Sequence, residues 1–262
     1  MIYLIGGSGF VGSAFARLFA TRGLPFQIVT RDNADELAGC ECDVLLNANG
    51  NSRKFMADRE PLWEFDASVR SVAETIARFK PRLHVHLSTG DVYPDQSSPQ
   101  TTREDQQIDV SRLSRYGLHK YVAEQLVQNT QDNWLIFRMG GFVGPGLKKN
   151  AIFDMLNNAP LWLSPESELQ FISTDRAAEI VWSVAQSQTR NEIINLGAKG
   201  IIQIGDLYRE LGSRSDLQHD AKKVRFELNL DKLARLSPVA LPETRREVLD
   251  FAQGGSLLKA SV

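Results

Sequence analysis

A chain of 262 residues, 42% hydrophobic and 24% charged, can bury one large core, or one main domain with a smaller appendage. A net charge of -2 argues against nucleic acid as a main partner, because proteins that bind phosphate backbones usually carry a basic excess. No stretch approaches the roughly 18 apolar residues that a membrane span needs, and the N-terminus lacks a secretory layout. We therefore expect a cytoplasmic protein with no membrane partner.

Short apolar runs alternate with amphipathic stretches through the first two-thirds of the chain. The apolar runs predict strands at Ile2–Ile5 and at residues 26–30, 43–47, 83–88 and 134–139. The amphipathic stretches predict helices at residues 11–22, 61–79 and 116–129. Parallel strands joined by right-handed helical crossovers follow from this alternation. We expect the α/β class: a doubly wound parallel sheet of the Rossmann type, with helices on both faces.

The pattern loosens after Gly146, where prolines interrupt it. Helices are predicted in this part at residues 151–157, 175–185, 204–211 and 241–251, and a strand at 193–196. We expect a small mixed subdomain that packs on the carboxyl edge of the sheet and binds substrate. The predicted division is a dinucleotide-binding core at 1–146, to which parts of the later chain return, and a substrate subdomain at 147–262.

A glycine-rich turn separates the first predicted strand from the first predicted helix. It consists of Gly6, Gly7, Ser8, Gly9, Phe10, Val11 and Gly12. The spacing fits G-x-G-x-x-G, in which glycines permit a tight turn and bring the backbone close to a pyrophosphate, while the helix N-terminus offers free N–H groups. Because the strand before it and the helix after it are both present, we predict a dinucleotide site. The alternative is a glycine-rich turn without a ligand.

The end of the second predicted strand bears on the choice of cofactor. NAD-selective sites place an acid there, about 20 residues after the glycines, to hold the ribose 2′-hydroxyl. This chain has Thr30 at that position, followed by Arg31, whose guanidinium can pair with the 2′-phosphate of NADP. We therefore predict NADP(H). NAD is the alternative, because a shift of the turn by one residue would bring Asp32 to the ribose.

Tyr116 and Lys120 form a Y-x-x-x-K pair on the helix predicted at 116–129. Positions four apart share a helix face, so the ammonium can stabilise the phenolate and let the tyrosine act as general acid or base toward an alcohol or ketone oxygen. A surface tyrosine beside a solvated lysine is the alternative. Thr89 follows a predicted strand at the edge where open α/β sheets bind ligands, and its hydroxyl can bind the same oxygen. We predict Thr89, Tyr116 and Lys120 as the catalytic residues.

Several separated motifs occur in a recognisable order. They are the glycine turn, the run 43–48, Ser88-Thr89-x-x-Val92-Tyr93, the Tyr116/Lys120 pair, and Phe137-Arg138-Met139-x-x-Phe142-Val143-Gly144-Pro145-Gly146. Together they resemble the extended short-chain dehydrogenases/reductases, the NAD-dependent epimerase/dehydratase family, from Ile2 to about residue 251. The resemblance implies an NAD(P)-dependent enzyme that acts on a sugar, in particular a nucleotide-sugar. It also places the catalytic hydroxyl four residues before Tyr93, which selects Thr89 over Ser88.

Further contacts are assigned from this resemblance and from positions near the carboxyl edge of the sheet. Besides Tyr116 and Lys120, the predicted cofactor-binding residues beyond the second strand are Asn47, Ala48, Asn49, Ser88 and Met139. The predicted substrate-binding residues are Arg53, Asp91, Tyr93, Gly141 and Asn150.

The chain departs from the family pattern beside the catalytic hydroxyl. Family members that dehydrate nucleotide-sugars resemble Thr-Asp-Glu there, whereas this chain has Thr89-Gly90-Asp91 and lacks one carboxylate, so 4,6-dehydration is not expected. The chemistry that remains supports a reductase or a nucleotide-sugar epimerase, and the NADP-type second strand favours the reductase. A non-catalytic NADP(H)-binding regulator is the third hypothesis, although such proteins usually lose the Tyr/Lys pair.

No metal site is predicted. Cys40 and Cys42 join no wider ligand pattern, and His84 and His86 share a strand face without a third ligand nearby. No nucleic-acid partner is expected, and a homodimer through the segments 61–79 and 116–129 is an expectation that amphipathicity alone does not prove.

Overall fold

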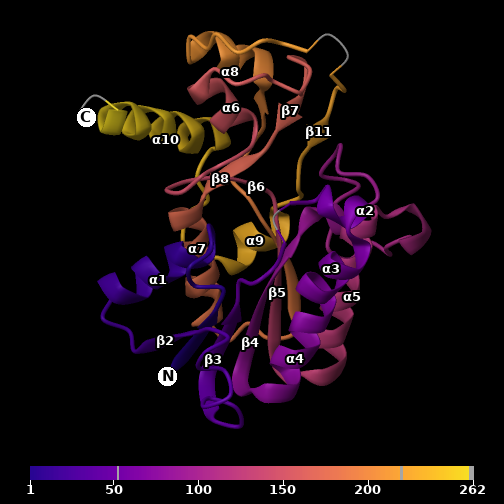
Figure 1. Cartoon of the computed structure of the whole chain (residues 1–262), viewed down its shortest axis with the longest axis vertical. Coiled ribbons are helices and arrows are strands. Elements are labelled where there is room, and N and C mark those ends of the chain that lie inside the picture. The colour runs from indigo at the N-terminus through magenta and orange to yellow at the C-terminus, as the bar shows by residue number, and fades with distance from the viewer. Residues whose placement is uncertain (52, 219–220, 260–262) are drawn as a thin grey trace.

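The computed structural model describes residues 1–51, 53–218 and 221–259, with side chains given to residue 254. Its main sheet has six strands in the order β2-β1-β3-β4-β5-β9, and each neighbouring pair is parallel. The strands are β1 (Ile2–Ile5), β2 (Phe26–Val29), β3 (Glu41–Asn47), β4 (Lys80–Thr89), β5 (Trp134–Met139) and β9 (Glu192–Leu196). The predicted parallel α/β sheet is therefore confirmed (Figure 1).

The strand order reverses direction at β1, which lies between β2 and β3. Ile5 at the end of β1 pairs with Asn47 at the end of β3. Open α/β sheets bind ligands in the crevice that such a reversal leaves at the carboxyl ends of the strands. The glycine turn after β1 and the loop after β3 meet at this switch point.

Helices cover both faces of the sheet (Figure 1). On one face lie α1 (Gly12–Thr21) and α7 (Thr174–Ala185), where the rings of Phe19 and Trp182 meet edge to face with centroids 4.9 Å apart. On the other face lie α4 (Ser71–Arg78) and α5 (Arg115–Thr130), which contribute Val72 and Val127 to a separate buried cluster with Ile136 of β5. The two layers bury apolar side chains against continuous hydrophobic strands, which is the usual source of stability in parallel sheets.

The helix predicted at 61–79 is present but contains an irregular turn. Helix α3 (Pro61–Phe65) begins at a proline, whose fixed φ and missing N–H suit the first turn of a helix. A π-helical turn, η1 (Asp66–Arg70), follows and leads into α4. Such turns insert an extra residue into a helix and occur often at functional sites. A short helix, α2 (Met56–Arg59), precedes α3.

The later part of the chain builds a second buried cluster above the carboxyl ends of the strands (Figure 1). Its helices are α6 (Ala151–Asn157), α8 (Ile204–Glu210) and α10 (Thr244–Lys259). Its strands form a parallel pair, β6 (Gly141–Val143) with β8 (Phe171–Ser173), and a sheet of β10 (Ile202–Gln203), β7 (Glu168–Leu169) and β11 (Arg225–Phe226). Strand β9 and helices α7 and α9 (Asp231–Leu236) belong instead to the layers of the main sheet. Within the described ranges, no helix is both long enough and apolar enough to cross a membrane.

Candidate active site

The glycine turn has the geometry of a phosphate cradle. Gly6 has a φ of 75°, and a Cβ there would lie 2.9 Å from the backbone of Ala48 and Asn49. A Cβ at Gly12 would collide with the carbonyl oxygen of Gly6. These two glycines therefore let the turn close on itself and let helix α1 start directly beneath it, as a dinucleotide motif requires.

Two backbone N–H groups at the start of α1 also indicate a phosphate-binding site. The backbone amides of Phe10 and Val11 donate to no other group in the part of the chain that the structure describes. Val11 caps the helix without a side-chain hydrogen bond, and the first turn of α1 holds no acidic residue. Free donors at the positive end of a helix suit an anionic phosphate, so the residues present fit a dinucleotide.

The residues proposed to select the cofactor lie at the end of β2. Thr30 Oγ1 accepts a hydrogen bond from the backbone N–H of Asp32 at 3.3 Å, which forms a tight turn. The side chains of Arg31 and Asp32 are both exposed, and Arg31 makes no hydrogen bond or ion pair with any described residue. Guanidinium and carboxylate are thus both available at this edge, and the choice between NADP and NAD stays a prediction.

The structure brings Thr89, Tyr116 and Lys120 together. Thr89 is the last residue of β4, and Tyr116 stands in the first turn of α5, where Ser114 caps the helix by accepting from the backbone N–H of Gly117 at 3.1 Å. The side chain of Thr89 lies close enough to Tyr116 to favour a lower pKa of its phenol. The ammonium of Lys120 is buried and donates to the carbonyl oxygen of Leu87 at 3.1 Å. Tyr116 and Lys120 lie four residues apart on one helix, as their spacing predicts, and their catalytic roles stay predictions.

Burial controls the ionisation of this pair. It raises the pKa of Tyr116 well above its ordinary value, an effect that the charges of Asp91 and Glu64 increase and the side chain of Thr89 opposes. Burial also lowers the pKa of Lys120 to about 8, against the opposing charges of Glu124 and Glu64. Tyr116 therefore carries its proton at neutral pH, as a general acid must.

Asp91 links Thr89 to the loop after β3. Thr89 Oγ1 donates to Asp91 Oδ2 at 2.7 Å, and Lys54 Nζ lies 2.6 Å from the same oxygen. Arg53 is exposed beside Lys54, and its backbone N–H donates to Asn51 Oδ1 at 2.7 Å. The charge of Lys54 compensates Asp91, so this acid does not leave a net negative charge at the site.

Ser88, predicted to bind cofactor, turns its side chain into the interior. Its hydroxyl donates to Glu124 Oε1 at 2.5 Å, and Glu124 also accepts from Arg138 Nη2 at 2.7 Å. Glu124 and Arg138 are both fully buried or nearly so. Any contact of Ser88 with a cofactor would have to use its backbone.

The other cofactor residues predicted beyond the turn flank the switch point and the end of β5. Asn47 Oδ1 accepts from the backbone N–H of Asn49 at 3.0 Å, across Ala48. Met139 is half-buried at the end of β5. All lie at the carboxyl edge of the sheet, and their contacts with a cofactor stay predictions.

Three residues predicted to bind substrate make contacts within the chain, which leave no surface on Tyr93 for a ligand, whereas substrate contacts of Gly141 and Asn150 stay predictions. Tyr93 is completely buried, donates from its hydroxyl to Asn195 Oδ1 at 2.9 Å, and presents no surface to a ligand. A Cβ at Gly141 would lie 2.8 Å from the carbonyl oxygen of Gln170, because β6 runs close against β8. Both ends of the Asn150 amide are used in capping α6 and in holding the carbonyl of residue 142. The sequence motifs that suggested these positions do not show how the residues pack in the fold.

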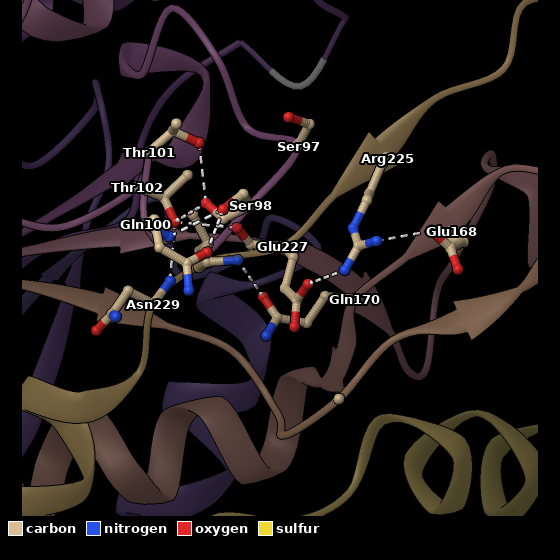
Figure 2. Close-up of polar contacts among 12 residues, drawn as sticks. Ser97, Ser98, Gln100, Thr101, Thr102, Glu168, Gln170, Arg225, Glu227 and Asn229 are labelled. Atoms are coloured by element: carbon tan, nitrogen blue, oxygen red, sulfur yellow. Dashed lines mark hydrogen bonds and ion pairs between the residues drawn. The ribbon is translucent and has the colours of Figure 1, made fainter.

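Figure 2 shows the segment 225–229, called here the crossing segment, beside the loop that carries Ser98 and Thr102. Thr102 Oγ1 donates to the carbonyl oxygen of Glu227 at 3.0 Å and accepts from the backbone N–H of Asn229 at 2.9 Å. The backbone N–H of Leu228 donates to Gln170 Oε1 at 3.0 Å. The crossing segment is thereby fixed to the loop that follows the catalytic strand.

The crossing segment places an apolar side chain next to Gly90, the residue that follows Thr89. A Cβ at Gly90 would lie 2.7 Å from the ring of Phe226 and 2.9 Å from Leu228. Phe226 therefore occupies the space that a side chain next to Thr89 would need. Sequence analysis missed it, because no local pattern connects positions 90 and 226.

Within the described residues, no group of three His, Cys, Asp or Glu side chains could hold a metal ion. His84 and His86 are fully buried in β4, with ring centroids 6.2 Å apart. Cys40 and Cys42 are free thiols.

A protein-family model described as the NAD dependent epimerase/dehydratase family matches residues 2–197. The chain therefore belongs to this family, and the resemblance drawn from its motifs is confirmed. It is an NAD(P)-dependent enzyme of the extended short-chain dehydrogenase/reductase type, with a nicotinamide dinucleotide as its cofactor.

Solved structures resemble the chain over almost its whole length. A UDP-galactose 4-epimerase is 20% identical, with 96% of this chain and 97% of that chain covered and a TM-score of 0.77. MoeE5 in complex with UDP-glucuronic acid and NAD is 15% identical, with coverage of 95% and 96% and a TM-score of 0.78. RMD from Pseudomonas aeruginosa complexed with NADPH is 16% identical, with coverage of 97% and 99% and a TM-score of 0.77. At these identities the likeness shows the fold. No curated protein matches the chain.

Proposed function

We propose that this chain is an NADP(H)-dependent reductase of a keto group on a sugar, in particular a nucleotide-sugar. The observation that carries the proposal is the convergence of Thr89, Tyr116 and Lys120 at the carboxyl edge of the sheet that also holds the glycine turn. MoeE5 holds UDP-glucuronic acid and NAD, and RMD holds NADPH, which supports a nucleotide-sugar substrate and a nicotinamide dinucleotide cofactor.

In this proposal the glycine turn holds the pyrophosphate, and Thr30 and Arg31 hold the 2′-phosphate. When bound, NADPH supplies a hydride to the carbonyl carbon. Tyr116 gives its phenolic proton to the carbonyl oxygen, so that a ketone becomes an alcohol with charge and atoms balanced. Thr89 turns its hydroxyl from Asp91 toward the same oxygen, and Lys120 stabilises the phenolate that remains.

The loop after β3 supplies cations for an anionic substrate group. Burial lowers the pKa of Lys149, and the neighbouring charges of Arg53 and Lys54 lower it further, so the three cations gather on one side of the site. Of the three, Lys54 forms an ion pair with Asp91, at 2.6 Å. We assign Arg53 and Lys54 to a phosphate or carboxylate of the substrate.

The decisive assay follows NADPH oxidation by the purified protein over a panel of 4-keto nucleotide-sugars and small ketones. We expect turnover with at least one of them, and loss of turnover by orders of magnitude in Tyr116→Phe with unchanged cofactor binding. Interconversion of sugar epimers without net oxidation of cofactor would replace the reductase by an epimerase. Cofactor binding without turnover of any kind would replace both by a regulator.

Cofactor choice is tested at the end of β2. Arg31→Ala should raise the KM for NADPH far more than the KM for NADH, because only NADPH carries the 2′-phosphate. Equal effects on the two cofactors would contradict the assignment.

We also propose a homodimer, in the cytoplasm where such an enzyme can draw on the NADPH pool. Helices α3 and α5 expose four large apolar side chains: Leu62, Trp63, Phe65 and Leu118. Exposed apolar side chains on neighbouring helices favour a surface that a second copy covers. Leu62→Asp should convert a dimer to a monomer in light scattering after gel filtration, and a wild-type monomer would contradict the proposal.

A further inference from the structure

A buried carboxylate lies next to the catalytic helix without a permanent cation. Glu64 of α3 is completely inaccessible to solvent. It accepts a hydrogen bond from the hydroxyl of Ser68, and its other oxygen contacts Nδ1 of His119. Removing a carboxylate from water is costly, and a neutral or partly charged imidazole compensates it less than an arginine would. The free-energy cost of burying this carboxylate indicates that the negative charge of Glu64 serves a function.

The partner of Glu64 stands inside the catalytic motif. His119 is the residue before Lys120 and the third after Tyr116 on α5. Its ring meets Phe65 edge to face with centroids 5.3 Å apart, and only 12% of its side chain is exposed. The contact between His119 and Glu64 therefore joins the helix turn that carries Tyr116 and Lys120 to α3.

The π-helical turn helps to make this attachment. Ser68 lies in η1, four residues after Glu64, and its hydroxyl reaches back to the carboxylate. Ser68 is itself buried. With Ser68 on one oxygen and His119 on the other, the orientation of the Glu64 carboxylate is fixed.

The charges around Lys120 show why an acid at this place matters. The groups that act on it are Glu124 of its own helix, Glu64 of α3 and, from β4, the fully buried His86. Glu124 is already bound by Arg138, whose guanidinium donates to both carboxylate oxygens. Glu64, in contrast, forms no ion pair with an arginine or a lysine among the described residues, so its charge is left to act on Lys120.

We propose that Glu64 and His119 are positioning residues that fix Tyr116 and Lys120 against α3 and supply the negative charge that keeps both of them protonated. The inference rests on the proposed catalytic function of that pair. The carboxylate favours the ammonium of Lys120 and disfavours a phenolate at Tyr116, which suits a site that delivers a proton.

The first test is the pH dependence of turnover in Glu64→Gln, which keeps both hydrogen bonds and removes the charge. The alkaline limb of kcat/KM should move to lower pH by about one unit, with KM for cofactor unchanged. Asp66→Asn, which removes an exposed acid two residues along the same helical stretch, is the matched control and should leave the limb in place. If the alkaline limb of kcat/KM in Glu64→Gln stays at the wild-type pH, the contact between Glu64 and His119 is only structural and the proposal is wrong.

Substitutions at His119 test whether this residue positions the helix turn that carries Tyr116 and Lys120. His119→Gln can still donate to Glu64 and should keep far more kcat than His119→Leu, with little difference in KM. Equal losses in the two variants would contradict the positioning role. This comparison also decides the matter if Glu64→Gln does not fold.

A measurement without substrate separates this inference from the proposed function. In protein labelled at lysine, the resonance of the Lys120 side chain, identified by its loss in Lys120→Arg, can be titrated by NMR. The wild-type resonance should titrate with a pKa of about 8, that of Glu64→Gln at lower pH, and that of Asp66→Asn as in the wild type. A shift seen here supports the inference even if no ketone is turned over, whereas unchanged titration in Glu64→Gln overturns it.

Discussion

The ion pair between Glu124 and Arg138 connects the catalytic helix to the sheet, and we expect its disruption to be the largest single loss of stability at this site. Arg138 Nε donates to the two oxygens of Glu124 at 3.1 and 3.2 Å, and Nη2 donates at 2.7 Å. Both side chains are almost completely buried. Glu124→Leu would leave a guanidinium buried without its partner and Ser88 without its acceptor. Breaking a buried pair in this way costs about 3–5 kcal/mol.

Urea denaturation measures the effect as a change in the free energy of unfolding. For a chain of this size the same loss lowers the melting temperature by roughly 2–4 °C per kcal/mol. The double variant Glu124→Leu/Arg138→Met should be more stable than Glu124→Leu alone, because it removes the unpaired charge as well. A loss below about 1 kcal/mol in Glu124→Leu, or a double variant that is less stable than Glu124→Leu, would refute the reasoning.

Three further predictions concern the core, the cofactor turn and the catalytic strand. Burial lowers the pKa of His84 to about 4 from an ordinary value near 6.5, so the unfolded chain takes up the proton first and the protein loses stability as the pH drops from about 6.5 to 4. His84→Leu should make the urea midpoint fall less steeply over this pH range. An unchanged pH dependence of the urea midpoint would contradict the prediction. Gly12→Ala should abolish NADPH binding or folding because its Cβ collides with the oxygen of Gly6, whereas Gly254→Ala, which faces open space, should bind NADPH as the wild type does in a fluorescence titration. Gly90→Asp should destabilise the protein by about 1–3 kcal/mol through its clash with Phe226, and Phe226→Ala in the same chain should recover part of that loss; a fully additive double variant would show that the two positions do not interact.

The sheet could be predicted because its signals are local. Leu4, Leu45 and Leu135 are completely buried, and each stands in a short apolar run bounded by turns or charges. Parallel strands with helices on both faces produce such runs, and the chain order of strands and helices then limits the topology. The strand order itself, with β1 between β2 and β3, depends on pairings that no single run contains.

The convergence of the three proposed catalytic residues was also within reach of the sequence, because one helix and one strand place all of them. Tyr116 and Lys120 are four apart on a helix, and Thr89 ends a strand, so helical and strand geometry bring them to the same edge. The same reasoning was wrong for Tyr93, which it assigned to the substrate site. Its position in the motif suggested a ligand contact, but the ring packs under the guanidinium of Arg138, 4.8 Å from its centroid.

The residues that sequence analysis missed act across long separations. Glu64 reads as one more charge on an amphipathic helix, and only the packing of α3 on α5 turns it inward against His119. Phe226 comes from the crossing segment, far from the catalytic strand in sequence, yet its ring fills the space beside Gly90. The absence of a second carboxylate there is therefore more than a substitution: the later part of the chain packs an apolar ring into the position that an acid would need. Restoring the acid requires a change in both segments, and this packing supports the prediction that the chain does not catalyse 4,6-dehydration.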